Sequence, residues 1–384
     1  MISRGAPLTE NMESKVVHVI GALVAGGAER FVVDLLLGLK RSGLRVSLLA
    51  LSSRRDSVGE AMCRSLREWG VPHACGPTKK VGVKSAIWYI GKLKKTGPAI
   101  VHLHTENTEL AHYIACKFYK KQHFIVRTIH SVERSSNRLH RLAFHRNPVN
   151  ISIACSDAVH MRCASMDERR IVTIPNGVNF GWPIQTTKLR EFYQRKLNLS
   201  ITKRHFVHVG RMSGESLGSA PKAHDLMIKA WKRGGLGERG GQLHFLGDGS
   251  LREKLKHLAG RDVSIAFQGV RGDVPDWLLA ANYYVMPSRY EGLPISGIEA
   301  VGTGVPCLFS DIPSLRELGA HAVLWSTVDD IQGLSENMIE ACATIFEIPY
   351  ADSERIRKKF GMDKTVMSYV DCYKRICDQP VTIF

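Results

Sequence analysis

The chain has 384 residues, enough for two hydrophobic cores, because a single core rarely grows beyond about 250 to 300 residues. Its hydrophobic and charged fractions, 44% and 23%, exclude a disordered or low-complexity chain. The net charge of +17 is uneven, since residues 1–180 hold 27 Lys and Arg against 13 Asp and Glu, whereas the remainder holds 26 against 23. This excess predicts an anionic partner for the N-terminal half: a membrane surface, a phosphorylated acceptor or nucleic acid.

The sequence shows neither a membrane-spanning segment nor a secretory signal. No apolar run reaches the roughly 18 residues that a membrane helix needs. The nine cysteines are scattered without a Cys-x-x-Cys pair, which predicts reduced thiols instead of a disulfide framework or a zinc site. We therefore expect a cytoplasmic protein, with a peripheral position on the inner face of the membrane through its basic N-terminal domain.

Short, continuous β-branched runs alternate with helical segments in the first half. Continuous runs suit strands that are buried on both faces of a parallel sheet. Helices at residues 29–40 and 106–119 fall between them, so the order predicts a doubly wound, Rossmann-like α/β domain. The predicted strands are residues 16–20, 45–51, 100–104, 124–129, 151–155 and 171–174.

The alternation stops in a polar, helix-prone segment within residues 181–200 and then begins again. This predicts a second domain over residues 181–365, after a first domain over residues 1–180. An amphipathic stretch at residues 353–377 follows the second sheet, and we expect the end of the chain, from about residue 366 to 384, to pack back on the first domain. The predicted strands of the second sheet are residues 205–209, 242–246, 264–267, 283–286 and 306–309.

The strongest local pattern lies at residues 287–306, where a buried strand is followed by a turn rich in Gly and Pro and then by a helix that begins near Ile295. The first N–H groups of a helix lack partners in the helix and attract negative charge, so a phosphate is the natural ligand there. Glu291 precedes the helix and Glu299 lies on it. Taken singly, each could equally be a solvated surface acid.

These residues resemble the Glu-x7-Glu signature of the retaining glycosyltransferases of family 4. Three further segments resemble that family in the same order: Pro-Asn-Gly-Val at 175–178, Gly-Arg at 210–211 and Gly-Asp-Gly at 247–249. The resemblance covers nearly the whole chain. It implies the GT-B fold, in which two facing Rossmann-like domains form a cleft, with the acceptor on the N-terminal domain and a nucleoside-diphosphate sugar on the C-terminal domain.

The resemblance also implies roles for single residues. Glu299 would bind the ribose, and Glu291 a hydroxyl group of the donor sugar. The amides of Leu293 and Ile295 would donate to the phosphates, and the base would lie against the backbone near Val270. The full set of donor-binding positions is Gly26, Gly27, Gly210, Val270, Gly292, Leu293, Pro294, Ile295 and Glu299.

Arg211 and Lys222 resemble the two cations with which the family neutralises the leaving diphosphate. The chain has no Asp-x-Asp motif, so we expect no metal and no other cofactor. Lys222 lies in a long loop rich in Gly and Ser and is followed by Ala223, where the family usually has a residue such as Gly. An ordinary loop lysine is therefore the alternative for Lys222.

Two histidines lie at the carboxyl ends of predicted strands. His130 follows residues 124–129 and matches the position of a histidine that contacts the sugar in the family. His104 ends residues 100–104 and is a weaker candidate for the same cleft. A histidine at the carboxyl end of a strand can donate a hydrogen bond to a sugar hydroxyl or transfer a proton. Most of the 16 histidines must instead be surface or core residues.

The sequence thus predicts a retaining, metal-independent hexosyltransferase with Glu291, His130, Arg211 and Lys222 as its catalytic residues. The expected donor is a UDP-sugar carrying a hexose or N-acetylhexosamine, and the expected acceptor is a saccharide or a lipid-linked saccharide of cell-envelope polysaccharide synthesis. Alternatives of the same fold are a nucleotide-sugar epimerase and a non-catalytic nucleotide-sugar-binding protein. A basic nucleic-acid-binding protein is the alternative from another class, although its basic residues are not interleaved with stacking aromatic residues.

Overall fold

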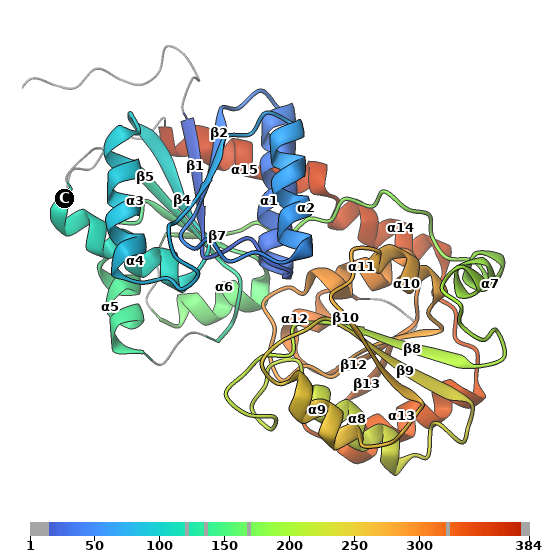
Figure 1. Cartoon of the computed structure of the whole chain (residues 1–384). Helices are drawn as coiled ribbons and strands as arrows, with labels where there is room; N and C mark the ends of the chain where they lie inside the picture. Colours follow the sequence, from blue (N-terminus) through green and yellow to red (C-terminus); the bar gives the residue numbers. More distant parts are fainter. Residues whose placement is uncertain (1–14, 120–122, 134–136, 167–169, 320–322, 378–384) are drawn as a thin grey trace, which may run out of the picture. The chain divides into compact units, whose positions relative to one another are not determined.

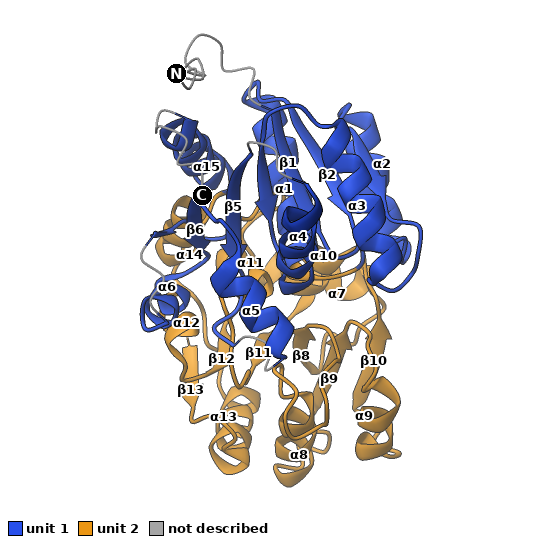
Figure 2. Cartoon of the chain, turned by 90° about the vertical axis from the view of Figure 1, so that its left-hand side faces the viewer, with its two compact units in different colours: residues 1–24, 28–177, 362–384 blue, residues 25–27, 178–361 orange. Residues whose placement is uncertain are grey.

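The computed structural model describes residues 15–119, 123–133, 137–166, 170–319 and 323–377. It divides into two compact units, one made of Met1–Val24, Ala28–Gly177 and Met362–Phe384, the other of Ala25–Gly27 and Val178–Gly361 (Figure 2). The division after Gly177 lies beside the predicted boundary at residue 180. Within the described residues, no helix is both long and apolar enough to cross a bilayer.

The first unit is built on a seven-stranded parallel sheet with the order β3-β2-β1-β4-β5-β6-β7. Its central strands are buried along almost their whole length, as their continuous apolar runs predict. The short β3 was not predicted, because its three residues include a histidine and form no apolar run. The strands are β1 (Lys15–Ile20), β2 (Val46–Ala50), β3 (His73–Cys75), β4 (Ala99–Leu103), β5 (Phe124–Ile129), β6 (Ile151–Ala154) and β7 (Ile171–Thr173).

Helices from both ends of the chain complete this unit. Figure 1 shows α15, coloured red, beside the blue α1. The two helices pack closely because Gly38 of α1 has no side chain, and a Cβ atom there would lie 2.3 Å from Val366 of α15. The helices are α1 (Gly27–Arg41), α2 (Ser57–Glu68), α3 (Val83–Lys95), α4 (Glu106–Phe118), α5 (Arg138–Arg146), α6 (Asp157–Ala164) and α15 (Met362–Cys377).

The second unit contains a six-stranded parallel sheet with the order β10-β9-β8-β11-β12-β13. Its strands are β8 (Arg204–Val209), β9 (Gly241–Leu246), β10 (Ile265–Gly269), β11 (Tyr283–Met286), β12 (Cys307–Ser310) and β13 (Val323–Ser326). Its helices are α7 (Thr187–Lys196), α8 (His224–Arg233), α9 (Arg252–Ala259), α10 (Val274–Ala280), α11 (Ile295–Thr303), α12 (Pro313–Arg316), α13 (Ile331–Ala343) and α14 (Tyr350–Lys359).

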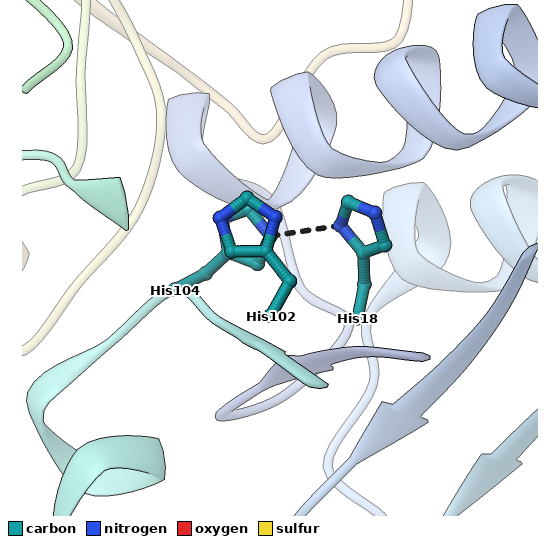
Figure 3. Close-up of side chains that lie close together, drawn as sticks. All are labelled: His18, His102 and His104. Atoms are coloured by element: carbon teal, nitrogen blue, oxygen red, sulfur yellow. Dashed lines mark hydrogen bonds between the residues drawn. The ribbon is translucent and has the colours of Figure 1, made fainter. Parts of the chain in front are cut away.

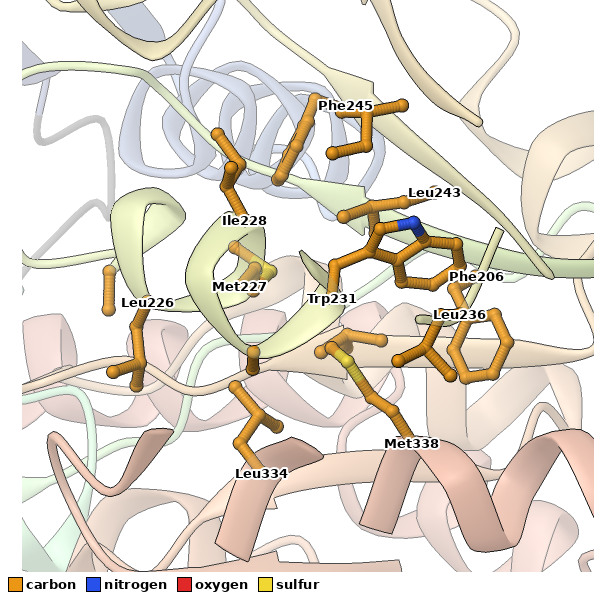
Figure 4. Close-up of a cluster of buried hydrophobic side chains, with 14 of the residues drawn as sticks. Phe206, Leu226, Met227, Ile228, Trp231, Leu236, Leu243, Phe245, Leu334 and Met338 are labelled. Carbon is orange, nitrogen blue, oxygen red and sulfur yellow. The ribbon is translucent and has the colours of Figure 1, made fainter. Parts of the chain in front are cut away.

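Trp231 of α8 lies at the centre of the second core (Figure 4). Its fully buried ring packs edge-on against Phe206 of β8, and its indole N–H donates to Ser264 Oγ at 2.9 Å. Leu334 and Met338 of α13 belong to the same cluster. The core thus joins one face of the sheet to two of its helices, and a buried indole keeps its polar atom satisfied.

The end of the chain forms two helices. The amphipathic stretch at residues 353–377 covers parts of both, because α14 ends at Lys359 and α15 begins at Met362. The break is fixed by a hydrogen bond from the Val178 amide to the Phe360 carbonyl, within a bridge between Val178 and Gly361. The second sheet also continues with β13, which the sequence reading did not find. Of α14 and α15, only α15 belongs to the first unit.

Both sheets reverse their strand order at the same point. In each, the first strand lies between the second and the fourth, so β1 pairs with β2 and β4, and β8 pairs with β9 and β11. Ligands of doubly wound sheets bind outside the carboxyl ends of the strands at this switch point. The residues after β8 and β11 in the second unit, and those after β1 and β4 in the first, are therefore the places to look for a site.

Candidate active site

Gly210 is the first residue after β8, at the switch point of the second unit. A Cβ atom added here would lie 2.7 Å from His208 Nε2 and 3.4 Å from Lys222 Cγ. The absence of a side chain therefore lets the aliphatic part of Lys222 pass close over the backbone. This gives a physical reason for Gly at the position that the sequence reading assigned to the donor site.

The amino end of α11 is held beside the carboxyl end of β8. Ser296 Oγ accepts a hydrogen bond from the Tyr284 hydroxyl at 2.8 Å and donates to the Val209 carbonyl at 3.2 Å. The backbone N–H groups of Ile295 and Ser296 have no hydrogen-bond partner within the described part of the chain, and the first turn of α11 carries no acidic residue. Such a helix end favours an anion.

Lys222 and Glu291 form an ion pair at this point. Lys222 Nζ donates to Glu291 Oε1 at 2.6 Å, and their side chains are only 22% and 10% exposed. The loop after β8 is thereby joined to the loop before α11. An ammonium group has three N–H donors, so Lys222 can bind a phosphate oxygen while it keeps Glu291. The structure thus brings together two residues that lie 69 positions apart in the chain.

Arg289 holds these two loops in place, and the sequence reading missed it. Its guanidinium donates to both carboxylate oxygens of the buried Asp225, at 3.1 and 3.3 Å, and to the Ala220 carbonyl at 2.8 Å. Its own amide donates to the Pro221 carbonyl at 2.8 Å. Arg289 therefore fixes the backbone on both sides of the Lys222–Glu291 pair. The only signal in the sequence was an arginine two residues before Glu291.

Ala223, directly after Lys222, adopts a left-handed conformation with φ 49° and ψ 40°. This region is costly for a residue with a Cβ atom and is where Gly is preferred. Gly, which the resemblance leads us to expect at this position, would adopt this conformation at a lower cost than Ala223. Lys222 Nζ is held by Glu291, and the role of Lys222 toward a donor stays a prediction.

Two models of known protein families match this chain, one in each of its two parts. Residues 25–181 match the family model described as Glycosyltransferase Family 4, and residues 203–344 match the one described as Glycosyl transferases group 1. The chain is a family 4 glycosyltransferase. The predicted family is confirmed, and the motifs at residues 210–211, 247–249 and 287–306 fall within the second match.

Two similar proteins are named as glycosyltransferases. UDP-Gal:alpha-D-GlcNAc-diphosphoundecaprenol alpha-1,3-galactosyltransferase of Escherichia coli is 25% identical over 316 residues, 78% of this chain and 79% of the relative. The lipopolysaccharide core biosynthesis mannosyltransferase LpsB of Rhizobium meliloti is 35% identical over 108 residues, 27% of this chain and 29% of the relative.

The solved structure of Anabaena Alr3699/HepE in complex with UDP and glucose has a TM-score of 0.76 to this glycosyltransferase at 16% identity, covering 94% of this chain and 99% of that one. Sucrose-phosphate synthase from Thermosynechococcus elongatus has a TM-score of 0.74 at 15% identity, covering 94% of this chain and 99% of that one. At these identities the likeness establishes the fold, and the predicted GT-B fold class is confirmed.

In this glycosyltransferase, the other predicted donor residues of the second unit lie as follows. Arg211 is exposed and directly follows Gly210, whereas Val270 directly follows the edge strand β10. Gly292, Leu293 and Pro294 are buried, and Pro294 is the residue before α11. Glu299 is half-buried on α11, one turn beyond Ile295. Their roles toward a donor stay predictions.

The Gly-Asp-Gly turn of this enzyme has a packing role. A Cβ atom at Gly247 would lie 2.1 Å from the Gly210 carbonyl oxygen, and one at Gly249 would lie 2.2 Å from that of Met212. The Met212 amide also donates to the Asp248 carbonyl at 3.0 Å. The two glycines therefore let this turn support the backbone of the loop after β8, which positions Arg211.

The predicted residues of the first part of the chain differ in their surroundings. Gly26 is half-buried and directly precedes Gly27, the exposed first residue of α1. His130 is half-buried after β5, and its ring lies edge-on to Phe31. Desolvation by burial lowers the pKa of His130 to about 4, so its imidazole is neutral near pH 7. His104 is buried and donates to or accepts from His130 at 3.2 Å.

His18, His102 and His104 form the one group of possible metal ligands found within the described ranges, with ring nitrogens within 4.8 Å of one another. Figure 3 shows their rings close together, with a hydrogen bond between His18 and His104. All six ring nitrogens already have hydrogen-bond partners. Their arrangement is therefore explained by hydrogen bonding, and the expected absence of a catalytic metal stays a prediction.

Proposed function

We propose that this glycosyltransferase transfers a hexose or N-acetylhexosamine from a UDP-sugar to a saccharide or lipid-linked acceptor of a cell-envelope polysaccharide, with retention of configuration and without a metal. The observation that carries the proposal is the Lys222–Glu291 pair beside the unpartnered amides of α11. Cationic and N–H groups at this point suit a diphosphate, and a carboxylate suits a sugar hydroxyl.

The proposed reaction breaks the bond between the anomeric carbon and the diphosphate oxygen and forms one between that carbon and the acceptor oxygen. Lys222, Arg211 and the end of α11 stabilise the negative charge on the leaving diphosphate. The acceptor proton passes to a phosphate oxygen on the same face of the sugar. Glu291 is held by Lys222 and binds a sugar hydroxyl, so it orients the donor and does not attack the anomeric carbon.

UDP as the donor nucleotide is supported by two of the similar proteins. The E. coli relative is named for UDP-Gal and for a diphosphoundecaprenol-linked acceptor, and the solved structure of HepE contains UDP and glucose. The excess of Lys and Arg in residues 1–180 agrees with a lipid-linked, phosphorylated acceptor and with binding to an anionic membrane surface.

The proposal is tested with a panel of UDP- and GDP-sugars in the presence of EDTA. We expect one UDP-sugar to raise the unfolding temperature and to be hydrolysed slowly, and both effects to be lost in Glu299→Ala. Glu340→Ala, which removes an exposed glutamate from α13, is the matched control and should keep both.

The other outcomes separate the alternatives. Binding without turnover in the presence of any acceptor would favour a nucleotide-sugar sensor, and a changed sugar still attached to its nucleotide would favour an epimerase. Turnover that EDTA abolishes and Mn²⁺ restores would contradict the metal-independent reaction. Absence of binding to every nucleotide sugar would overturn the proposal.

A further inference from the structure

A continuous series of side-chain hydrogen bonds crosses the interior of the first unit, from the end of β5 to α15. Six bonds connect seven side chains, and each bond is 3.3 Å or shorter. We call this series the histidine relay. In order, it joins His130 Nε2 to His104 Nδ1, His104 Nε2 to His18 Nδ1, His18 Nε2 to the Tyr373 hydroxyl, that hydroxyl to His102 Nδ1, His102 Nε2 to Thr128 Oγ1, and Thr128 Oγ1 to the Tyr369 hydroxyl.

The sheet brings these residues together. His18 of β1 and His102 of β4 are register partners on neighbouring strands, and His104 lies two positions beyond His102, so that the three point to the same face. Figure 3 shows the His18 and His104 rings directed at each other. Tyr369 and Tyr373 come from α15 and are four positions apart, so they share one face of that helix.

Every histidine in the relay is neutral. Desolvation by burial lowers the pKa of His18 to about 3 and holds the pKa values of His102 and His104 well below the usual range. A neutral imidazole carries one N–H group and one bare nitrogen. His18, His102 and His104 are hydrogen-bonded at both nitrogens, so each must donate on one side and accept on the other. Only two directions for the whole series also use the hydroxyl hydrogens of Tyr373 and Thr128 in its bonds.

Tyr369 decides between the two directions. It is fully buried, and within the described residues its hydroxyl has a single hydrogen-bond partner, Thr128. If every donor pointed toward Tyr369, the Tyr369 hydroxyl hydrogen would be buried without an acceptor, which costs free energy. If every donor points away from Tyr369, the last proton lies on His130 Nδ1, and among the described residues that N–H group is the only group of the relay left without a partner. The opposite direction leaves two buried groups without partners, the Tyr369 O–H group and the bare His130 Nδ1, so it is the costlier one.

We infer that the histidine relay holds His130 in the tautomer with its proton on Nδ1, so that His130 donates a hydrogen bond to a sugar oxygen and does not act as a general base. His130 Nδ1 is shielded from water and has no hydrogen-bond partner in the described part of the chain, as expected for a donor whose acceptor is a ligand. The ligand in this inference rests on the proposed function. The tautomer does not.

A metal ion would be another reason for three buried histidines to meet. However, His18 Nδ1 and His104 Nε2 are 2.9 Å apart, a hydrogen-bonding distance. Two nitrogens bound tetrahedrally to one Zn²⁺ at about 2.05 Å would be about 3.3 Å apart. The geometry therefore fits the relay better than a metal centre.

The tautomer can be measured directly by ¹⁵N NMR of the full chain with ¹⁵N-labelled histidine, with His130 assigned from the signals that disappear in His130→Gln. At pH 7 we expect a protonated Nδ1 and a bare Nε2. A protonated Nε2 would overturn the direction of the relay, and a doubly protonated ring would overturn the relay itself. Addition of Zn²⁺ should leave the His18, His102 and His104 signals unchanged.

Tyr373→Phe tests whether α15 controls His130 through the relay. Without the Tyr373 hydroxyl, the constraint at Tyr369 is no longer transmitted, so we expect His130 to populate both tautomers and kcat/KM for the donor to fall roughly five- to tenfold. Tyr89→Phe is the matched control, because it removes a buried tyrosine–histidine bond of 2.9 Å, to His112 Nδ1, outside the relay.

The outcomes separate the inference from the proposed function. Unchanged His130 signals in Tyr373→Phe, or the same change in Tyr89→Phe, would overturn the positioning role of the relay. If the tautomer shifts in Tyr373→Phe while the wild type binds no nucleotide sugar, the relay stands and the proposed function fails. The unfolding midpoints of both variants are measured alongside, so that a general loss of structure is not mistaken for a change in the relay.

Discussion

The two sheets of this glycosyltransferase reverse their strand order at equivalent places but carry different chemistry there. The first unit has neutral, buried histidines within β1 and at the end of β4, whereas the second unit has an ion pair and a helix end after β8 and β11. Neutral donors can orient a sugar hydroxyl but attract little charge, while cationic groups suit a diphosphate. The same fold thus carries two different sets of groups at its switch points, and the proposed function uses the second set for the diphosphate.

Acidification should have the largest effect and should weaken both units, because their histidines differ in hydrogen bonding and not in burial. Burial lowers the pKa to about 3 in His18 of the first unit and to about 3 in His208 and His244 of the second. In the unfolded chain these rings titrate near pH 6.5, so the unfolded state binds more protons below that pH. The contribution of these neutral histidines to the free energy of unfolding should be complete above pH 6.5 and should decrease as the pH falls toward 3.

Hydrogen exchange measured peptide by peptide at pH 7.5, 6 and 5, corrected for the intrinsic exchange rate, reports on each unit separately. We expect faster opening of both units at pH 5. Loss of protection in one unit alone would show that the two sets of buried histidines are not equivalent.

Lys222→Met removes a cationic group from the second unit. Turnover should fall by about 10²- to 10³-fold, because the leaving diphosphate loses a preorganised cation. Lys256→Met is the matched control, since it removes a partly exposed lysine that pairs with Glu253 on α9, and its turnover should equal that of the wild type. Equal turnover in Lys222→Met and wild type would move the reaction away from this site.

A smaller effect is expected from Arg289→Met. This variant keeps both residues of the Lys222–Glu291 pair and removes the guanidinium that holds the neighbouring loops. Asp225, 2% exposed, would lose its guanidinium partner, although Lys229 still contacts it at 3.1 Å. We expect the free energy of unfolding to fall by about 2 to 3 kcal/mol, because a buried carboxylate is left poorly paired. Urea unfolding of the full chain, with the second unit followed by hydrogen exchange of its peptides, measures this.

Arg316→Met provides the comparison for Arg289→Met. Arg316 binds Asp311 through two hydrogen bonds, but both side chains are about half exposed, so its loss should change stability little. If the two variants were equally stable, Arg289 would be no more than a surface arginine, and the two loops would need another explanation for their position.

Much of the fold followed from local patterns in the sequence. Strands β5 and β11 were predicted with their observed bounds, because continuous apolar runs between turns have few other uses in a parallel sheet. β3 was missed because its three residues include a histidine and form no such run. β13 was missed because its apolar run, Val323 to Trp325, is only three residues long. The start of α11 at Ile295 was also predicted correctly, from the Gly and Pro residues before it.

The contacts within the site were harder to predict. Lys222 could be assigned only by resemblance, because its approach to Glu291 depends on how two distant loops are held by Arg289 and Asp225. The histidine relay was missed for a similar reason, since it depends on the register between β1 and β4. A signal was present: a histidine in the middle of each apolar strand, His18 and His102, is unusual unless it is hydrogen-bonded.

The most direct test of the central claim is hydrogen exchange of the wild-type chain with and without UDP. The account predicts slower exchange in peptides that cover residues 209–223 and 287–303, which carry Arg211, Lys222, Glu291 and the amino end of α11. Protection confined to the first unit, or no protection at saturating UDP, would contradict a nucleotide site at the switch point between β8 and β11.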